Sequence, residues 1–178
     1  NNDRVGLILF SDQIEKIVPP RKGRSHVLRL ITDILTTKPS HRGTDLSLAL
    51  NYLSHVAKRK TVTFLISDFL TEKYDRPLRI VARKHDLVPV VITDPLELKF
   101  PALGLVELED PETGDRSLVD TSEPRIRTSF ARAMAALRDD RLRLFKKLEL
   151  DAIEVNTQED YAVGLQRFFR RRSLRAAM

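Results

Sequence analysis

Continuous apolar runs and segments with helical spacing follow one another along the chain and predict an α/β fold. Apolar runs of strand length, typical of strands buried on both faces, lie at 5–10, 62–66 and 87–92. Apolar residues recur at helical spacing in 27–35, 46–57 and, more weakly, 72–85. The order strand, helix, strand, helix, strand indicates parallel strands joined by right-handed crossovers.

Two hairpins are expected beside these parallel strands. Residues 14–18 have a mixed pattern that ends at two prolines and suits an edge strand, which would pair with the strand at 5–10. Alternating apolar residues at 106–110 and 116–120 flank a glycine-containing turn. This alternation predicts a second hairpin with one solvated face.

The C-terminal part of the chain completes the predicted architecture. A long helix is expected from 124 to 148, a short strand at 152–155 and a last helix after the capping-box-like segment 157–160. We therefore expect one domain over residues 1–178. Its fold class is α/β: a doubly wound, mostly parallel sheet flanked by helices, with an added C-terminal hairpin and helices.

Composition excludes several classes of protein. The absence of cysteine rules out disulfides, thiol catalysis and cysteine-type zinc sites, and it is compatible with the cytoplasmic location that we expect. No run approaches the roughly 20 apolar residues of a membrane helix, and the first residues show no signal-peptide pattern. Because the first residue is Asn and not Met, we expect the chain to come from the interior of a longer gene product.

The formal net charge of +6 is concentrated near the C-terminus. Five arginines lie in the last dozen residues: Arg167, Arg170, Arg171, Arg172 and Arg175. A solvated helix end explains them best, with an anionic partner as the alternative; nucleic acid is not expected, because no recognition motif or aromatic platform accompanies them. Arg138, Arg141 and Arg143 are likewise predicted to lie on a solvated helix face.

Polar residues at two predicted loops carry the candidate chemistry. Thr44 lies in the loop Arg42-Gly43-Thr44-Asp45, and Asp68 follows Ser67 directly after the strand at 62–66. Ligands collect at the carboxyl ends of strands in open parallel sheets, and a hydroxyl and a carboxylate there are hard oxygen ligands suited to Mg²⁺. The simpler alternatives are helix capping for Thr44 and turn capping for Asp68.

The residues around this pair have simple structural alternatives as well. Asp45 is expected in the first turn of a helix, where an anion interacts well with the helix dipole. Ser67 is expected to bond the backbone. His41 and Arg42 flank the pair and are candidates for contact with an acidic partner, or plain loop residues.

Several stretches resemble a known family. The segments RVGLILFS (4–11), RGTDL (42–46) and FLISDF (64–69) resemble a von Willebrand factor A-type domain. The further combination of RKHD (83–86), TDP (93–95), Gly104 and EDPETG (109–114) is similar, more narrowly, to the bacterial DUF58 family. The resemblance covers nearly the whole chain.

The resemblance implies a metal-ion-dependent adhesion site on a doubly wound sheet. Thr44 matches the threonine of that site, and Asp68 matches its last aspartate, which often acts through water. The family's Asp-x-Ser-x-Ser motif, which follows the first strand, does not occur here. We therefore expect an N-terminally truncated domain that lacks the first strand and its three ligands. Mg²⁺, or Mn²⁺ or Ca²⁺, would bind the complete protein but this chain only weakly or not at all.

The missing strand has a predicted position between the strands at 5–10 and 62–66. The gap would be filled by an upstream segment, by a neighbouring chain or by direct pairing of the two strands, because exposed apolar strand edges recruit other strands.

Two functions from different classes are compatible with these residues. The first is a non-enzymatic protein-interaction module with a metal site at Thr44 and Asp68 and with His41, Arg42, Asp45 and Ser67 near the partner. Similarity to DUF58 implies a partner among MoxR-type AAA+ ATPases or other A-domain proteins, in a chaperone-like or cofactor-insertion role. The alternative is a metal-dependent hydrolase or phosphotransferase that uses Asp68 with Lys73 or Arg76, although no phosphate-cradling glycine-rich loop supports it.

Overall fold

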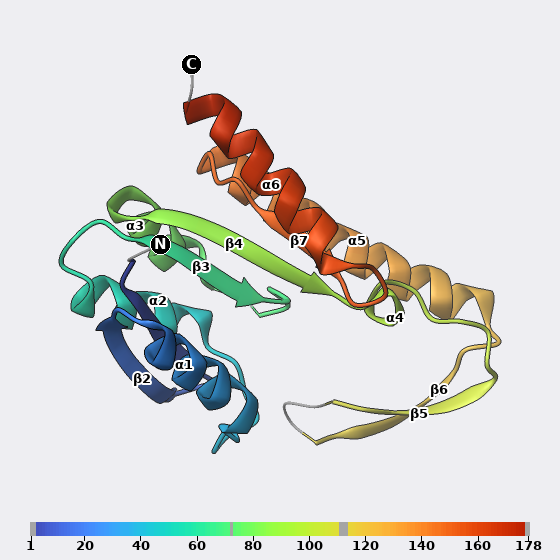
Figure 1. The fold of residues 1–178 in the computed structure, drawn as a ribbon. Helices are drawn as coiled ribbons and strands as arrows, with labels where there is room; N and C mark the ends of the chain where they lie inside the picture. Colours follow the sequence, from blue (N-terminus) through green and yellow to red (C-terminus); the bar gives the residue numbers. More distant parts are fainter. Residues whose placement is uncertain (1–2, 72, 111–113, 177–178) are drawn as a thin grey trace.

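Strands and helices alternate along most of the chain in the computed structural model (Figure 1), which describes residues 3–71, 73–110 and 114–176. The strands are β1 (Val5–Phe10), β2 (Ile14–Arg21), β3 (Val62–Ser67), β4 (Asp86–Thr93), β5 (Leu105–Glu109), β6 (Arg116–Asp120) and β7 (Ile153–Asn156). The helices are α1 (Arg24–Thr36), α2 (Leu46–Val56), α3 (Asp75–Lys84), α4 (Pro95–Leu98), α5 (Pro124–Lys147) and α6 (Tyr161–Ala176).

The predicted fold class is confirmed. Strands β3, β4 and β7 form a parallel sheet in the order β3-β4-β7, flanked by helices, as in doubly wound α/β folds. Both predicted hairpins are present, β1 with β2 and β5 with β6. The short helix α4 was not expected from the sequence; Asp94 begins it with a capping box that includes Glu97.

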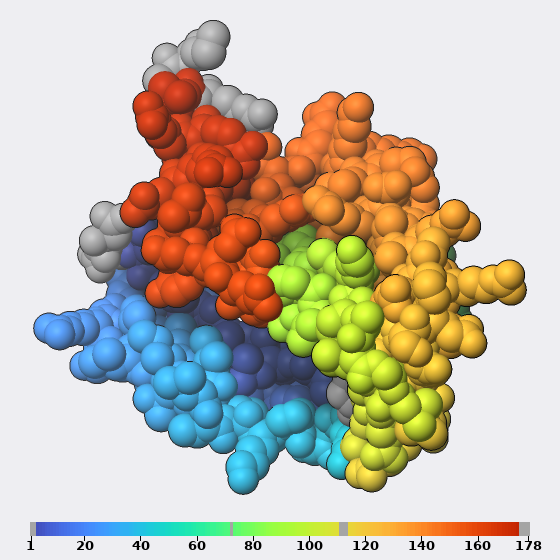
Figure 2. Space-filling model, turned by 90° about the vertical axis from the view of Figure 1, so that its right-hand side faces the viewer, coloured from blue at the N-terminus to red at the C-terminus, as the bar shows by residue number. Residues whose placement is uncertain are grey.

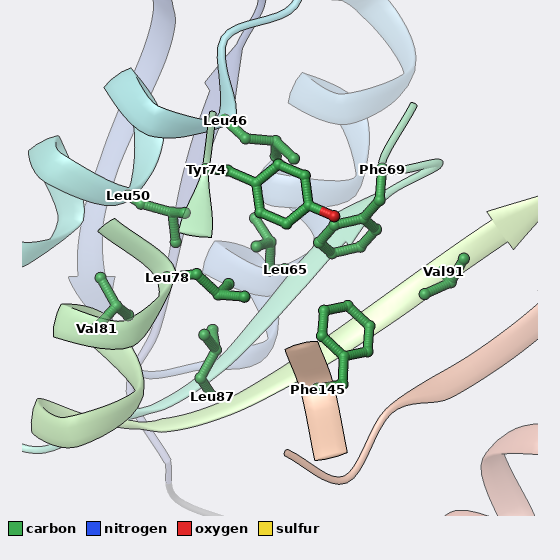
Figure 3. Packing of buried hydrophobic residues seen from close by; sticks show 10 residues of the cluster. All are labelled: Leu46, Leu50, Leu65, Phe69, Tyr74, Leu78, Val81, Leu87, Val91 and Phe145. Atoms are coloured by element: carbon green, nitrogen blue, oxygen red, sulfur yellow. The ribbon is translucent and has the colours of Figure 1, made fainter. Parts of the chain in front are cut away.

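The buried core lies on both faces of the parallel sheet, which explains the continuous apolar sequence of β4. On one face, Leu65 of β3 packs with residues of α2, α3 and α5 (Figure 3), among them Leu50, Leu78 and Phe145. On the other face, Val88 and residues near it pack with Phe168 of α6. A strand enclosed in this way has no solvated side, so alternation of apolar and polar residues disappears.

β3 differs from β4 because one of its faces is buried and the other is largely exposed, with Phe64 in contact with Phe169 of α6 at a ring-centroid distance of 6.5 Å. Leu65 is buried, whereas Val62, Phe64 and Ile66, which point to the opposite side, are exposed. Among the described residues, β3 pairs only with β4 and β1 pairs only with β2. Direct pairing of β1 with β3, one of the three outcomes expected from the sequence, is therefore not observed, and an additional strand between them stays a prediction.

The side of the molecule toward which β3 and β4 run is hollowed (Figure 2). The view shows the first two strands (dark blue) at the floor of the hollow, with the α1–α2 region (blue and cyan) on one side and the end of β4 and α6 (green and red) on the other. Among the described residues, no helix is both long and apolar enough to cross a membrane.

Candidate functional site

The start of α2 lies between the ends of β1 and β3. The amide of Asp45 donates to the carbonyl of Ser11, directly after β1, with an N···O distance of 2.9 Å. The hydroxyl of Thr71, in the loop after β3, donates to the carbonyl of Thr44 at 3.3 Å, and Ser47 donates to the carbonyl of Lys73 at 2.8 Å. These bonds bring the loops of Thr44 and Asp68 together at one edge of the sheet, as their positions in the sequence predicted.

Asp45, and not Thr44, caps helix α2. The backbone of Asp45 is extended and its Oδ1 accepts from the amide of Leu48 at 2.9 Å, so the expectation that Thr44 is the N-cap and that Asp45 lies in the first turn is wrong. The reason is a shift of one residue in the start of the helix, which begins at Leu46. The half-buried Thr44 hydroxyl makes no hydrogen bond to any described residue, and it therefore has its lone pairs available to a ligand.

The carboxylate of Asp68 is exposed and is held by its own loop. Its Oδ1 accepts from the amide of Leu70 at 3.1 Å and from the hydroxyl of Ser67 at 3.3 Å. Ser67 also accepts from the amide of Phe69 at 3.0 Å, which confirms the expected backbone bond of that hydroxyl. Within the described ranges, no donor reaches Oδ2 of Asp68, so one carboxylate oxygen is available to a cation or a water.

Asp12 is an acidic residue of this edge that the sequence analysis did not single out. It follows β1 as Asp68 follows β3, and its carboxylate lies 3.1 Å from Nδ1 of His41. Gly43 lies next to it, and a Cβ at Gly43 would be in van der Waals contact with that of Asp12 at 3.4 Å. The position after an apolar strand-length run was the available signal, but Ser11-Asp12-Gln13 also fits a plain turn.

Glu15 of β2 connects the end of β1 to the loop before α2. Its carboxylate accepts from the hydroxyls of Ser11 at 2.6 Å and of Ser40 at 2.8 Å, and from the amide of Ser40 at 2.9 Å. These bonds lower the pKa of Glu15 to about 2 because they stabilise the ionised form. The bond from the Ser11 hydroxyl has the largest effect. Glu15 is thus a structural support of the loop that carries His41.

The β5–β6 hairpin reaches the same loop from the other side. Nη1 of Arg42 lies 3.9 Å from Oε1 of Glu109, which also pairs with Arg116 at 3.0 Å. His41 and Arg42 are both exposed, so they remain accessible to a partner beside these contacts.

The chemistry of Thr44 and Asp68 fits part of a divalent-cation site. A hydroxyl and a carboxylate with unused oxygen lone pairs are ligands of the kind that Mg²⁺ takes. No group of three or more His, Cys, Asp or Glu side chains suited to a metal ion occurs among the described residues, and near-octahedral coordination of Mg²⁺ requires more than two ligands. Lys73 and Arg76, named for the hydrolase alternative, make no ion pair with Asp68 within the described ranges.

Relatives and one solved structure resemble the chain. "Uncharacterized protein Mb1516" of Mycobacterium bovis is 30% identical over 169 residues, which cover 93% of this chain and 53% of that protein. "Uncharacterized protein MAV169" of Mycobacterium avium is 32% identical over 158 residues, which cover 87% of this chain and 93% of that protein. The chain thus spans about half the length of the Mycobacterium bovis protein.

The solved structure is that of the conserved hypothetical protein BatB from Bacteroides thetaiotaomicron. It superimposes with a TM-score of 0.54 at 14% sequence identity and covers 99% of this chain and 81% of that chain. This similarity shows a shared fold. The family model described as "Protein of unknown function DUF58" matches residues 1–140, and the chain belongs to that family.

Proposed function

We propose that this chain is the interaction part of a non-enzymatic protein that holds a divalent cation at Thr44 and Asp68. The observation that carries the proposal is the contact between their loops at the carboxyl end of β3. A cation held there by oxygen ligands keeps a coordination position that a partner's Asp or Glu can complete. When bound, the metal supplies the contact to the partner's carboxylate. The chain's own loops hold Thr44 and Asp68 in place for the metal.

The remaining ligands are proposed to come from an additional segment between β1 and β3. The edges of these strands that face away from β2 and β4 have no partner among the described residues, and β3 has an exposed apolar face. A strand at this place would end beside Ser11 and Ser67, next to Thr44 and Asp68. The complete metal site would then combine Thr44 and Asp68 of this chain with ligands from that segment.

The proposed partner is a MoxR-type AAA+ ATPase or another A-domain protein, in a chaperone-like or cofactor-insertion role in the cytoplasm. The resemblance stated above is the basis for this class of partner. Exposed His41 and Arg42 would face an acidic partner, while Asp45 and Ser67, which are engaged in local hydrogen bonds, would support the loops that meet it.

The test is binding of the complete protein to its cognate MoxR-type ATPase, measured by calorimetry with Mg²⁺ and with a chelator. We expect Thr44→Val and Asp68→Asn to weaken binding at least tenfold and the chelator to have the same effect. Thr32→Val on α1 and Asp139→Asn on α5 are matched controls on exposed helix positions, and they should leave binding unchanged. Binding that persists with the chelator and in both site variants would contradict the proposal, and Mg²⁺-dependent turnover of phosphoesters would favour the hydrolase alternative.

A further inference from the structure

Arg141 of α5 contacts the Asp68 segment from inside the protein. It is only 8% exposed, and its Nη1 donates to the backbone carbonyl of Asp68 at 3.2 Å. The prediction of a solvated helix face is therefore wrong for Arg141, although Arg138 and Arg143 on the same helix are exposed and pair with acidic side chains. Arg138 reaches Glu154 of β7 from an exposed position, and of the three arginines only Arg141 is buried.

Helix α5 also contacts Phe69, the residue after Asp68, through its next turn. Phe145 lies one turn beyond Arg141, on the same helix face, and its ring meets that of Phe69 edge-on at a centroid distance of 5.3 Å. Tyr74 meets Phe69 from another side at 5.6 Å, also edge-on. Figure 3 shows the three rings together in the core. Helix α5 thus fixes two consecutive residues, 68 through its backbone carbonyl and 69 through its side chain.

This segment has a backbone conformation that requires such support. Phe69 has φ +59°, in the left-handed region that is unfavourable for a residue with a bulky side chain. Conformations of this kind persist where the surrounding structure determines them, and they occur often at functional sites. The turn at Phe69 places the amide of Leu70, which donates to Oδ1 of Asp68 at 3.1 Å, so the turn helps to orient the Asp68 carboxylate.

Arg141 itself is in an unfavourable environment for a cation. It forms no salt bridge within the described ranges, and its Nε is buried without a hydrogen-bond partner. Burial lowers the pKa of Arg141, since desolvation disfavours the charged form. A residue retained for packing alone would be expected to be apolar, because a well-packed apolar side chain usually replaces a buried ion without loss of stability.

We propose that Arg141 is a positioning residue of the candidate metal site, which holds the Asp68 backbone so that the carboxylate is presented at the end of β3. This inference rests on the proposed function of Asp68 as a ligand. The fork of the guanidinium supplies the donor that reaches the Asp68 carbonyl, and the helix behind it supplies rigidity. The metal itself is not needed for this role, which allows a test in its absence.

The first experiment is amide hydrogen exchange of this chain without metal. In Arg141→Met, exchange at Phe69 and Leu70 is expected to accelerate at least tenfold, while amides of β4 and α3 keep their rates. Because a single hydrogen bond joins Arg141 to the Asp68 carbonyl, the one charged donor of Arg141→Lys should keep exchange within about threefold of the unmodified chain. Arg138→Met, an exposed arginine on the same helix, is the matched control and should change nothing at residues 69–70.

Two results would overturn the inference. Unchanged exchange at Phe69 and Leu70 in Arg141→Met would show that the arginine does not hold the segment. Equal acceleration there and in β4 would show a general contribution to stability only.

The second experiment measures Mn²⁺ binding by the complete protein. Arg141→Met is expected to weaken binding at least tenfold and Arg141→Lys less than threefold; equal affinity of Arg141→Met and the unmodified protein contradicts the inference. If the unmodified complete protein binds no Mn²⁺ while local exchange still responds to Arg141→Met, the proposed function fails and the role of Arg141 in holding the segment stands.

Discussion

The two faces of β3 allow a sharp test of the structure around the candidate site. Leu65 and Ile66 are adjacent aliphatic residues on the same strand, and they point to opposite faces. Leu65 is 7% exposed and belongs to the core, whereas Ile66 is 57% exposed. The variants Leu65→Ala and Ile66→Ala each shorten a similar side chain on the same strand. They differ mainly in whether that side chain is buried or exposed.

The expected losses of stability differ severalfold. Leu65→Ala should lower the free energy of unfolding by about 2–5 kcal/mol, because a cavity remains in the core. Complete burial of such a side chain contributes about 1.5–3 kcal/mol, and with roughly two fifths of it buried Ile66→Ala should remove about 0.6–1.3 kcal/mol. The difference reflects the greater exposure of one face of β3, because both residues lie on the same strand.

Urea denaturation followed by circular dichroism gives both values from midpoints and slopes. A loss for Ile66→Ala that equals or exceeds the loss for Leu65→Ala would refute the assignment of one buried and one exposed face. The same two changes in a longer protein that includes the proposed additional strand extend the test. There Ile66→Ala should approach the loss of about 2–5 kcal/mol that is typical of a core position.

Two further predictions concern residues that support the site and the sheet. Asp45→Ala should lower the free energy of unfolding by about 1 kcal/mol through loss of the α2 cap, and Asp45→Asn by only a few tenths; equal effects of the two variants in thermal or urea unfolding would contradict the assignment of the cap. In the folded protein, burial and, second to it, the neighbouring Lys84 lower the pKa of His85. As the pH falls, His85 is therefore protonated at a higher pH in the unfolded state than in the folded state. The contribution of His85 to stability is therefore complete above its ordinary pKa near 6.5 and decreases below it. Melting temperatures at pH 7.5 and 5.5 should differ more for the unmodified chain than for His85→Gln, and an equal difference in both would refute this.

The sequence was sufficient to predict the main elements of the fold because their signals are local. The apolar run in β4 and the alternation in β5 and β6 each indicate a strand within a few residues of its observed bounds. The site loops followed from the same patterns, since polar residues after buried strands lie at one edge of a parallel sheet. The contact between the loops of Thr44 and Asp68 agrees with this prediction, and their role as metal ligands stays a prediction.

Contacts between distant elements were outside the reach of these patterns. The role of Arg141 depends on which side of a long helix faces the sheet, and the arginines of α5 look alike in the sequence. The sequence does not distinguish Thr44 from Asp45 as the cap of α2, because both are good N-cap residues. Packing determines at which of the two neighbouring residues the helix starts. Asp12 was missed because its partner His41 lies 29 positions away in the sequence.

The most direct test of the central claim is the position at which a paramagnetic cation binds this chain. Mn²⁺, like Mg²⁺, prefers oxygen ligands in octahedral geometry. In ¹H–¹⁵N spectra with substoichiometric Mn²⁺, we expect weak binding to broaden the amide signals of residues 11–12, 43–45 and 67–70 first. Asp68→Asn should remove this effect and Asp139→Asn should leave it unchanged. Broadening confined to acidic residues elsewhere, such as Asp139 and Asp140 on α5, with signals near Thr44 and Asp68 unaffected, would contradict the claim.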